Sequence, residues 1–131
     1  IQGERVRQLK AEKAQEIYRK YKYYDNLAED LIRYAALREC KLAEKTAERL
    51  LEIEKELEIH EGLHASVQAL TDIACGHWNS EEGLIHYGWW LKVAIFSIFA
   101  KHYGWLLAGT KVLAEYPERE QIRAFVKSLK K

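Results

Sequence analysis

The segment from residue 84 to residue 114 constrains the fold of this 131-residue chain more than any other part of it. The segment is apolar on nearly every side of a helix, holds Trp89, Trp90 and Trp105, and is interrupted by three lysines. A helix that is apolar all round must be covered all round. Because a chain of this length has little material for that cover, we expect the helix to pack against other copies of the chain or against a partner.

A membrane is another way to cover such a helix, and the sequence argues against it. The uncharged runs in the segment, such as Val93–Ala100, span at most nine residues, whereas a transmembrane helix needs about 20 apolar residues. We therefore expect a helix that mediates assembly, and leave open a surface that faces a membrane without crossing it. The residues expected at this assembly interface are Trp89, Trp90, Ile95, Phe96, Phe99 and Trp105.

The rest of the chain indicates an all-α protein. Residues 51–59 alternate like a strand, but charged helix formers on both sides and a 3/4 spacing of apolar residues favour a helix there. Glycine and proline are absent between Gly3 and Gly62, so the first half of the chain lacks helix breakers. We predict an extended helical bundle of four to five helices, with a basic N-terminal helical arm at residues 1–24 and a single bundle domain at residues 25–131.

Turn and cap signals set the expected helix boundaries. Asp25–Asn26 is expected to end the first helix, and a second, very long helix is expected to run from there to Cys75–Gly76, with a bend at Gly62. Ser80, which two glutamates follow, is a good N-cap for the apolar helix because acidic side chains favour the positive helix end. Pro117 is expected to start a short basic helix.

The net charge is only +1, but it is unevenly distributed. Residues 1–24 contain seven basic and three acidic residues, a net charge of +4. Residues 119–131 contain five basic residues and one acidic residue, also +4, whereas residues 25–58 contain six basic and ten acidic residues, or −4. Basic segments are the usual footprint of a polyanionic partner, although solvated helix faces look the same in a sequence. The expected phosphate contacts on the arm are Arg5, Arg7, Lys10, Lys13, Arg19, Lys20 and Lys22.

The sharpest local motif is HEGLH at residues 60–64, which matches HExxH. On a helix, His60 and His64 face the same way and can bind Zn²⁺, and Glu61 can act as a general base. The third ligand is poorly placed, because the extended motif needs a histidine where Leu70 stands. Semi-buried histidines at a helix–helix seam have the same spacing. We therefore predict no cofactor and no catalytic residue, and keep a zinc site as an alternative.

The cysteine count and the amide content bear on the setting of the protein. Cys40 and Cys75 are too few for a disulfide framework and do not form a CxxC motif, which favours a reducing interior while leaving one bridge open. The chain has two Asn and five Gln beside abundant Glu and Lys. Depletion of thermolabile amides together with Glu and Lys enrichment is a habit of hyperthermophile proteins.

Taken together, these features resemble the major capsid proteins of filamentous and rod-shaped archaeal viruses. The resemblance rests on the all-helical chain of this length, the basic N-terminal helix, the long amphipathic helices and the apolar segment at residues 84–114. In that family a helical bundle carries an N-terminal arm, and the arms of paired subunits wrap duplex DNA in the A form. The resemblance covers the organisation of the whole chain and no short motif. Family arms are often more basic than this one.

The resemblance implies a structural, non-enzymatic subunit of a virion that wraps double-stranded DNA without reading its sequence. Its partners would be other copies of the chain or a paralogous coat subunit, with a lipid envelope as a further contact. Two alternatives from other classes stay open. One is a small zinc-dependent metallohydrolase that uses HEGLH at residues 60–64. The other is a helical oligomeric adaptor that binds no nucleic acid.

Overall fold

The computed structural model describes residues 2–57, 61–107 and 116–130, apart from the side chains of Gln2, Val6, Trp105, Leu106 and Leu107. Within these ranges the chain forms five α-helices and one 3-10 helix and contains no strand, which confirms the predicted all-α helical bundle. The elements are α1 (Gln2–Ala36), α2 (Cys40–Leu51), the 3-10 helix η1 (Glu52–Lys55), α3 (Glu61–Ala74), α4 (Glu81–Leu107) and α6 (Arg119–Ser128).

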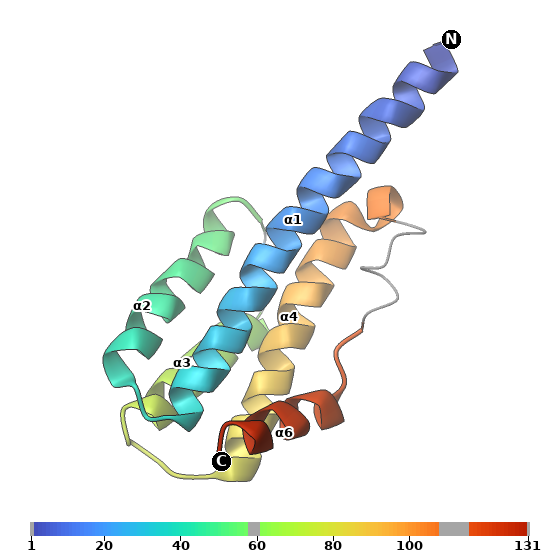
Figure 1. Cartoon of the computed structure of the whole chain (residues 1–131). Coiled ribbons are helices and arrows are strands. Elements are labelled where there is room, and N and C mark those ends of the chain that lie inside the picture. Colours follow the sequence, from blue (N-terminus) through green and yellow to red (C-terminus); the bar gives the residue numbers. More distant parts are fainter. Residues whose placement is uncertain (1, 58–60, 108–115, 131) are drawn as a thin grey trace.

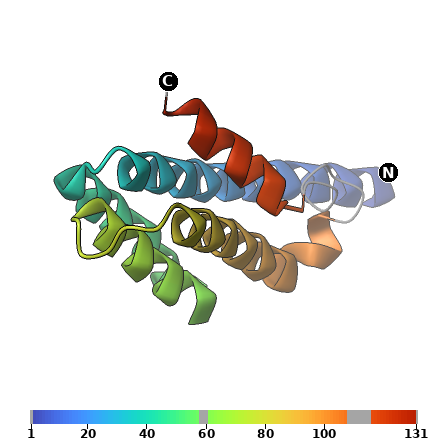
Figure 2. The same ribbon diagram turned by 90° about the horizontal axis from the view of Figure 1, so that it is seen from below.

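The bundle is built around α1 and α4, which lie side by side (Figure 1). Helix α1 also packs against α2 and α3, and α3 packs against both α2 and α4. The short helix α6 crosses α1 and α4 on the side away from α3 (Figure 2). The N-terminal turns of α1 extend beyond the other helices, so the molecule consists of a bundle and a projecting helical segment.

The core lies along the facing sides of the four long helices. It is mostly aliphatic and aromatic, and burial of one large side chain contributes about 1.5–3 kcal/mol. The largest fully buried side chains are Leu31, Ile32, Leu50, Ile53, Leu63, Leu70, Ile85, Leu91, Ile95 and Phe99. Gly88 brings α4 close to two other helices, because a methyl group there would lie 3.0 Å from Cδ1 of Ile32 and 3.1 Å from Cγ2 of Ile122.

The first helix does not end at Asp25–Asn26, so that prediction is wrong. Helix α1 is continuous from Gln2 to Ala36. Asp and Asn are only moderately poor helix formers, costing less than about 1 kcal/mol each relative to Ala. Their neighbours Tyr24, Leu27 and Ala28 are buried in the core, and that burial outweighs the local preference.

The prediction of one long second helix is also wrong. The predicted range is divided among the end of α1, helix α2 and helix α3. The turn that separates α1 from α2 contains no glycine. Arg38 adopts a left-handed conformation with φ 59°. The N–H of Glu39 donates to the carbonyl of Tyr34 at 2.9 Å, and the N–H of Arg38 donates to that of Ala35 at 3.4 Å. This is the hydrogen-bond pattern of a Schellman cap, a position that glycine usually fills. The Arg38 guanidinium supports the turn by donating to the carbonyl of Ile73 at 3.0 Å.

A disulfide joins this turn to the end of α3. Cys40, the first residue of α2, is bonded to Cys75, which directly follows α3. The single bridge that the sequence left open is therefore present, and the setting of the protein stays a prediction. The sequence did not predict this bond, because the two cysteines are 35 positions apart. They meet only because α3 packs beside the turn between α1 and α2.

The predicted end at Gly76 and the predicted cap at Ser80 are confirmed, whereas the predicted bend at Gly62 is not, since Gly62 lies in the first turn of α3. Helix α6 begins at Arg119, two residues after Pro117. Gly76 has φ +80° and ends α3, and the N–H of His77 donates to the carbonyl of Asp72 at 2.9 Å in the matching cap pattern. The Ser80 hydroxyl accepts the N–H of Gly83 at 2.9 Å and so caps the start of α4. Residues 51–57 contain no strand, since Glu52–Lys55 is a 3-10 helix.

Candidate nucleic-acid interface

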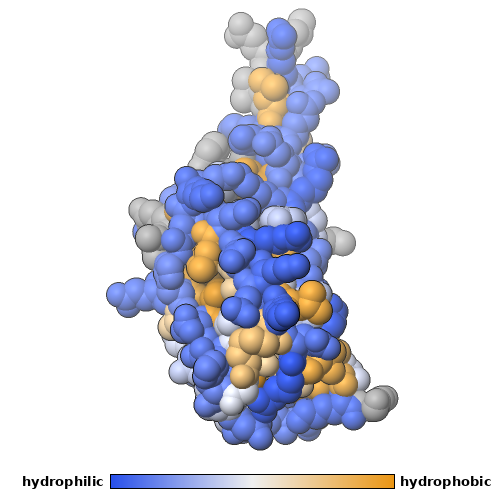
Figure 3. Space-filling view, turned by 90° about the vertical axis from the view of Figure 1, so that its left-hand side faces the viewer, coloured by the Kyte–Doolittle hydropathy of each residue, from blue (hydrophilic) through white to orange (hydrophobic). Residues whose placement is uncertain are grey.

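The part of α1 that projects from the bundle is shorter than the predicted arm of residues 1–24. The core begins at Ile17, which is almost completely buried, whereas the described side chains of residues 3–16 are exposed, with Ala14 half-buried. We call residues 3–16 the free arm. Its surface is mostly hydrophilic, with a small hydrophobic patch (Figure 3). Leu9 is 58% exposed on this arm.

The charges of the free arm are segregated. On a helix with 3.6 residues per turn, Arg7, Lys10 and Lys13 follow one another at steps of three and lie on one side. We call these three residues the basic face. Lys10, Ala14 and Ile17 follow at steps of four and three, so the basic face continues the side of α1 that enters the core. Arg5 and Glu12 lie on the opposite side, whereas Glu4 and Glu16 lie one turn before Arg7 and one turn after Lys13, at the two ends of the basic face.

The cations of the basic face are accessible to a ligand. Within the described part of the chain, the side chains of Arg7 and Lys10 make no hydrogen bond or ion pair with other residues. Lys13 lies 3.6 Å from the carboxylate of Glu16, and both side chains are more than half exposed. An exposed pair of this kind contributes about 0–1 kcal/mol and does not hold the lysine in place.

Three more of the predicted phosphate contacts, Arg19, Lys20 and Lys22, lie nearer the bundle, and Arg5 lies at the tip of the arm. Arg19 is exposed, and its Nε donates to the carbonyl of Gln15 at 3.4 Å. The Lys20 ammonium forms an ion pair with Glu56, and that hydrogen bond raises the pKa of Lys20. The Lys22 ammonium lies 6.0 Å from the centre of the Tyr18 ring. Lys20 and Lys22 are therefore less available to a phosphate than the basic face.

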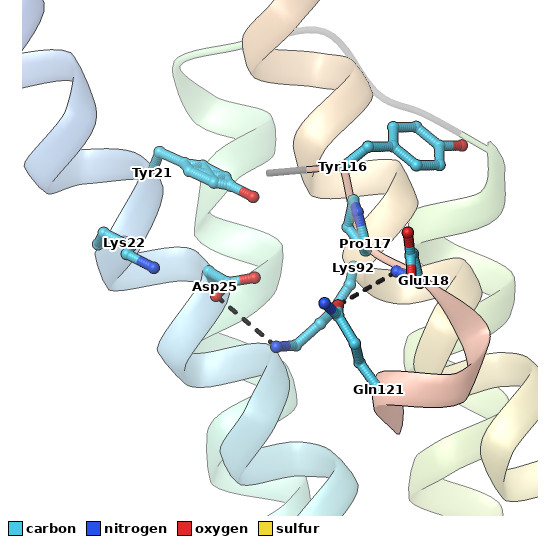
Figure 4. A pocket seen from close by; sticks show the side chains of 8 residues that line it. All are labelled: Tyr21, Lys22, Asp25, Lys92, Tyr116, Pro117, Glu118 and Gln121. Carbon is cyan, nitrogen blue, oxygen red and sulfur yellow. Dashed lines mark hydrogen bonds and ion pairs between the residues drawn. The ribbon is translucent and has the colours of Figure 1, made fainter. Parts of the chain in front are cut away.

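A polar cavity of about 530 Å³ opens at the base of the free arm, between α1, α4 and the start of α6 (Figure 4). Asp25 and Lys92 face each other across it, with 3.7 Å between Oδ2 and Nζ. Burial raises the pKa of Asp25, although the nearby ammonium of Lys92 opposes that effect. Lys22 and Glu118 also line the cavity. With two cations and two carboxylates, it does not favour a phosphate.

The expectation that α4 is mainly an assembly surface is corrected for three residues. Ile95, Phe96 and Phe99 are buried in the core of the single chain, because α1, α3 and α6 together cover most of α4. Trp89 is half-buried and held by α6 and the residues before it: its Nε1–H donates to the carbonyl of Pro117 at 3.1 Å. Trp90 remains 37% exposed. The Trp105 side chain lies outside the described residues.

Helix α4 is also long and apolar enough to cross a membrane by length and composition, over Glu81–Gly104, although the sequence argued against a span. In the structure, 56% of its most apolar 18-residue window is buried inside the bundle. The core helix of a soluble protein has the same length and composition, so these two properties do not identify a membrane span. Contact with a lipid envelope stays a prediction.

Only part of the HEGLH motif lies within the described residues, so the zinc alternative stays a prediction. His60 lies outside them, Glu61 is exposed, and the Nε2 of His64 lies against the carboxylate of Glu54. Among these residues, the one group of three metal-ligating side chains is Cys40, Glu44 and Cys75. Because its two sulfurs form the disulfide, they are not available as thiolates.

Protein-family models, curated proteins and solved structures give no match to this chain. Function has to be inferred from the geometry of the molecule. Two features escaped the sequence reasoning: the pairing of Lys20 with Glu56, and the exposure of Leu9 on the arm. The first joins residues 36 positions apart and leaves no local signal. The second follows from the length of α1 that the bundle covers.

Proposed function

We propose that this chain is the structural subunit of a helical nucleocapsid, which packages double-stranded DNA without reading its sequence. The free arm lies along the duplex with its basic face toward the phosphates. Copies of the chain, alone or with a paralogous coat subunit, assemble around the DNA to form a virion. The chain has no enzymatic role in this proposal.

The observation that supports the proposal is the exposure of the basic face, Arg7, Lys10 and Lys13, on a helical segment that the chain's own bundle leaves uncovered. Fourteen helical residues span about 21 Å at 1.5 Å per residue, so several phosphates of one strand lie within reach. Arg and Lys bind phosphates without any requirement on the base sequence. A disulfide in a chain of hyperthermophile-like composition also suits the proposal, because intracellular proteins of hyperthermophilic archaea are rich in disulfides.

The number of cations explains why assembly is part of the function. Three phosphate contacts give a slope of about −2.7 for the logarithm of the binding constant against the logarithm of salt concentration. A fourfold rise in salt then weakens binding by about 40-fold. One subunit therefore binds DNA weakly. Many subunits that contact one another along the same duplex bind far more tightly, because each linked contact raises the effective concentration of the next.

Retention of duplex DNA on filters, measured over a range of salt concentrations, tests the proposal. The variant Arg7→Gln/Lys10→Gln/Lys13→Gln removes the basic face. The matched control is Lys41→Gln/Lys45→Gln/Arg49→Gln, which removes three exposed cations from α2 and changes the net charge by the same amount. We expect the arm variant to lose most of the salt dependence, a reduction of the slope by about 2.7, and the control to keep it.

Two outcomes would contradict the proposal. The first is that the wild-type chain retains no duplex DNA even at low salt. The second is that both triple variants lose the same affinity, which would mean that overall charge and not the arm determines binding. Because the arm cations are exposed and separate from the core, neither variant is expected to unfold the bundle.

A further inference from the structure

Three side chains that can bind a metal ion meet where the turn between α1 and α2 lies against the end of α3. They are Cys40 at the start of α2, Glu44 one turn further along α2, and Cys75 directly after α3. Their ligand atoms, two sulfurs and a carboxylate oxygen, all lie within 4.8 Å of one another. This cluster lies at the end of the bundle opposite the free arm (Figure 1), so its chemistry is independent of the proposed function.

The disulfide does not explain the position of the Glu44 carboxylate. Oε1 of Glu44 lies 3.4 Å from Sγ of Cys40, but a sulfur in a disulfide carries no hydrogen and cannot donate to it. Within the described part of the chain, Glu44 makes no other hydrogen bond or ion pair. A carboxylate placed beside a sulfur in this way is the arrangement expected where both bind the same cation.

The distance between these two atoms matches a zinc site. When Zn–S is about 2.3 Å and Zn–O about 2.0 Å, a sulfur and an oxygen ligand of a tetrahedral site lie about 3.5 Å apart. The 3.4 Å between Cys40 and Glu44 agrees with that separation. Two sulfur ligands of such a site lie about 3.8 Å apart. The two cysteines therefore have to move apart from their bonded positions, and rotation about their Cα–Cβ bonds supplies that movement.

Contacts other than the disulfide hold the cluster together. Arg38, in the turn between α1 and α2, donates to the carbonyl of Ile73 at 3.0 Å and to Oδ1 of Asn79. Ala43 of α2 and Ala74 at the end of α3 are buried in the core. Cleavage of the disulfide therefore leaves the two thiols close to each other and to the carboxylate.

Reduction converts the two sulfurs into metal ligands. A phosphine and a water molecule reduce the disulfide: the phosphine becomes a phosphine oxide, and the two sulfurs take up two electrons and the two protons of the water. Zn²⁺ then displaces these two protons and binds the two thiolates. Cys40 lies at the positive end of α2, which stabilises a thiolate there. Thiolate ligands favour Zn²⁺ over Mg²⁺ and Ca²⁺, which take oxygen ligands.

We infer that the reduced chain binds Zn²⁺ through Cys40, Glu44 and Cys75, with water as the fourth ligand. The two cysteines are half-buried and Glu44 is exposed, so a reductant and the ion can both reach the cluster. The disulfide and the zinc ion are alternative links between the α1–α2 turn and α3. This junction is thus closed to metal when it is oxidised and is linked by metal when it is reduced.

The zinc content of the full chain after gel filtration tests the site, with the oxidised chain and the phosphine-reduced chain measured by elemental analysis. We expect a single zinc ion per reduced chain and none per oxidised chain. Co²⁺ is a spectroscopic probe for the same site, because a cobalt–thiolate bond adds a charge-transfer absorption that oxygen and imidazole ligands do not give. That absorption is expected in the reduced wild type and is expected to be absent from Cys40→Ser/Cys75→Ser.

A matched pair of variants tests the role of Glu44. Glu44→Gln removes the carboxylate ligand, whereas Glu48→Gln removes an exposed carboxylate one turn further along α2. Loss of a partner outside the ligand shell already costs about 10–100-fold in metal affinity. In the reduced chain, Glu44→Gln is therefore expected to weaken zinc binding by at least that much, and Glu48→Gln to bind as the wild type does. Competition with a chromophoric chelator measures both affinities.

Three results would overturn the inference. The first is a reduced wild type that binds no zinc. The second is equal zinc binding by the oxidised and reduced chains, which would place the ion elsewhere, as the HEGLH alternative does. The third is equal zinc affinity in Glu44→Gln and Glu48→Gln, which would mean that the two thiols bind zinc without the folded cluster. Failure of DNA retention would refute the DNA-packaging proposal and leave these zinc measurements unaffected.

Discussion

The two halves of α1 share one helix and differ in what holds it together. From Ile17 to Ala36 the helix is anchored by buried side chains such as Tyr21 and Leu31, whereas the free arm has its described side chains in solvent. An isolated helix of about 14 residues is marginal in water, because nucleation is costly. The buried half of α1 provides the helical turns from which the helix grows, so the free arm only extends an existing helix and does not have to nucleate one. Packing therefore creates an exposed helix that the arm sequence alone would not hold.

The largest effect is expected from removing the disulfide, which anchors only the buried half. Cys40→Ala/Cys75→Ala opens a loop of 35 residues, and the chain-entropy model gives a loss of about 4 kcal/mol in the free energy of unfolding. Urea denaturation without reductant measures it, and the wild type with reductant should show the same loss. Hydrogen exchange in the free arm should be fast in both proteins. An unchanged urea midpoint would show that packing alone fixes the α1–α2 turn.

A matched pair of leucines tests the comparison within α1 directly. Leu31→Ala in the buried half creates a cavity and is expected to lower the free energy of unfolding by about 2–5 kcal/mol. Leu9→Ala in the arm removes an exposed side chain and is expected to change it by less than about 0.5 kcal/mol. Thermal unfolding at low protein concentration gives both values. Comparable losses would mean that the arm packs on its own bundle in solution.

The smallest effect concerns the pH dependence of stability through Asp25, which lies in the buried half of α1 and lines the polar cavity. Burial raises the pKa of Asp25, so the folded chain holds this proton at pH values at which the unfolded chain has released it. The free energy of unfolding therefore falls as pH rises from the ordinary carboxyl pKa through the raised one. Asp25→Asn removes this contribution, so its stability relative to the wild type should increase with pH over that window. Parallel urea-denaturation curves for the two proteins would contradict it.

Helix boundaries were predictable from the sequence where the interactions that set them lie within a few residues. The cap at Ser80 and the glycine turn at Gly76 act over a few residues, and both were predictable. The turn at Arg38 was not, because its left-handed backbone is supported by Ile73 and Asn79, which are far away in the sequence. The apolar character of α4 was correctly noticed, but its cover comes from three other helices of the same chain and not mainly from a partner.

The candidate site was also predictable only in part. The cationic residues of the arm were identifiable from composition, whereas the difference between Lys10, which is accessible, and Lys20, which pairs with Glu56, needed the fold. The cluster of Cys40, Glu44 and Cys75 was equally inaccessible to sequence reasoning, because Cys75 meets the other two only when α3 packs beside the turn between α1 and α2.

The sequence by itself determined that the chain is helical, where two of its caps lie, and that a cationic segment begins it, since these follow from local propensity, hydrogen bonding and charge. Only the tertiary structure decided that α1 passes through Asp25 without a break, that Ile95 and Phe99 are core residues, and that residues 3–16 remain outside the bundle. The physical reason is that burial sums over contacts between distant segments and outweighs the small local preferences that a sequence displays.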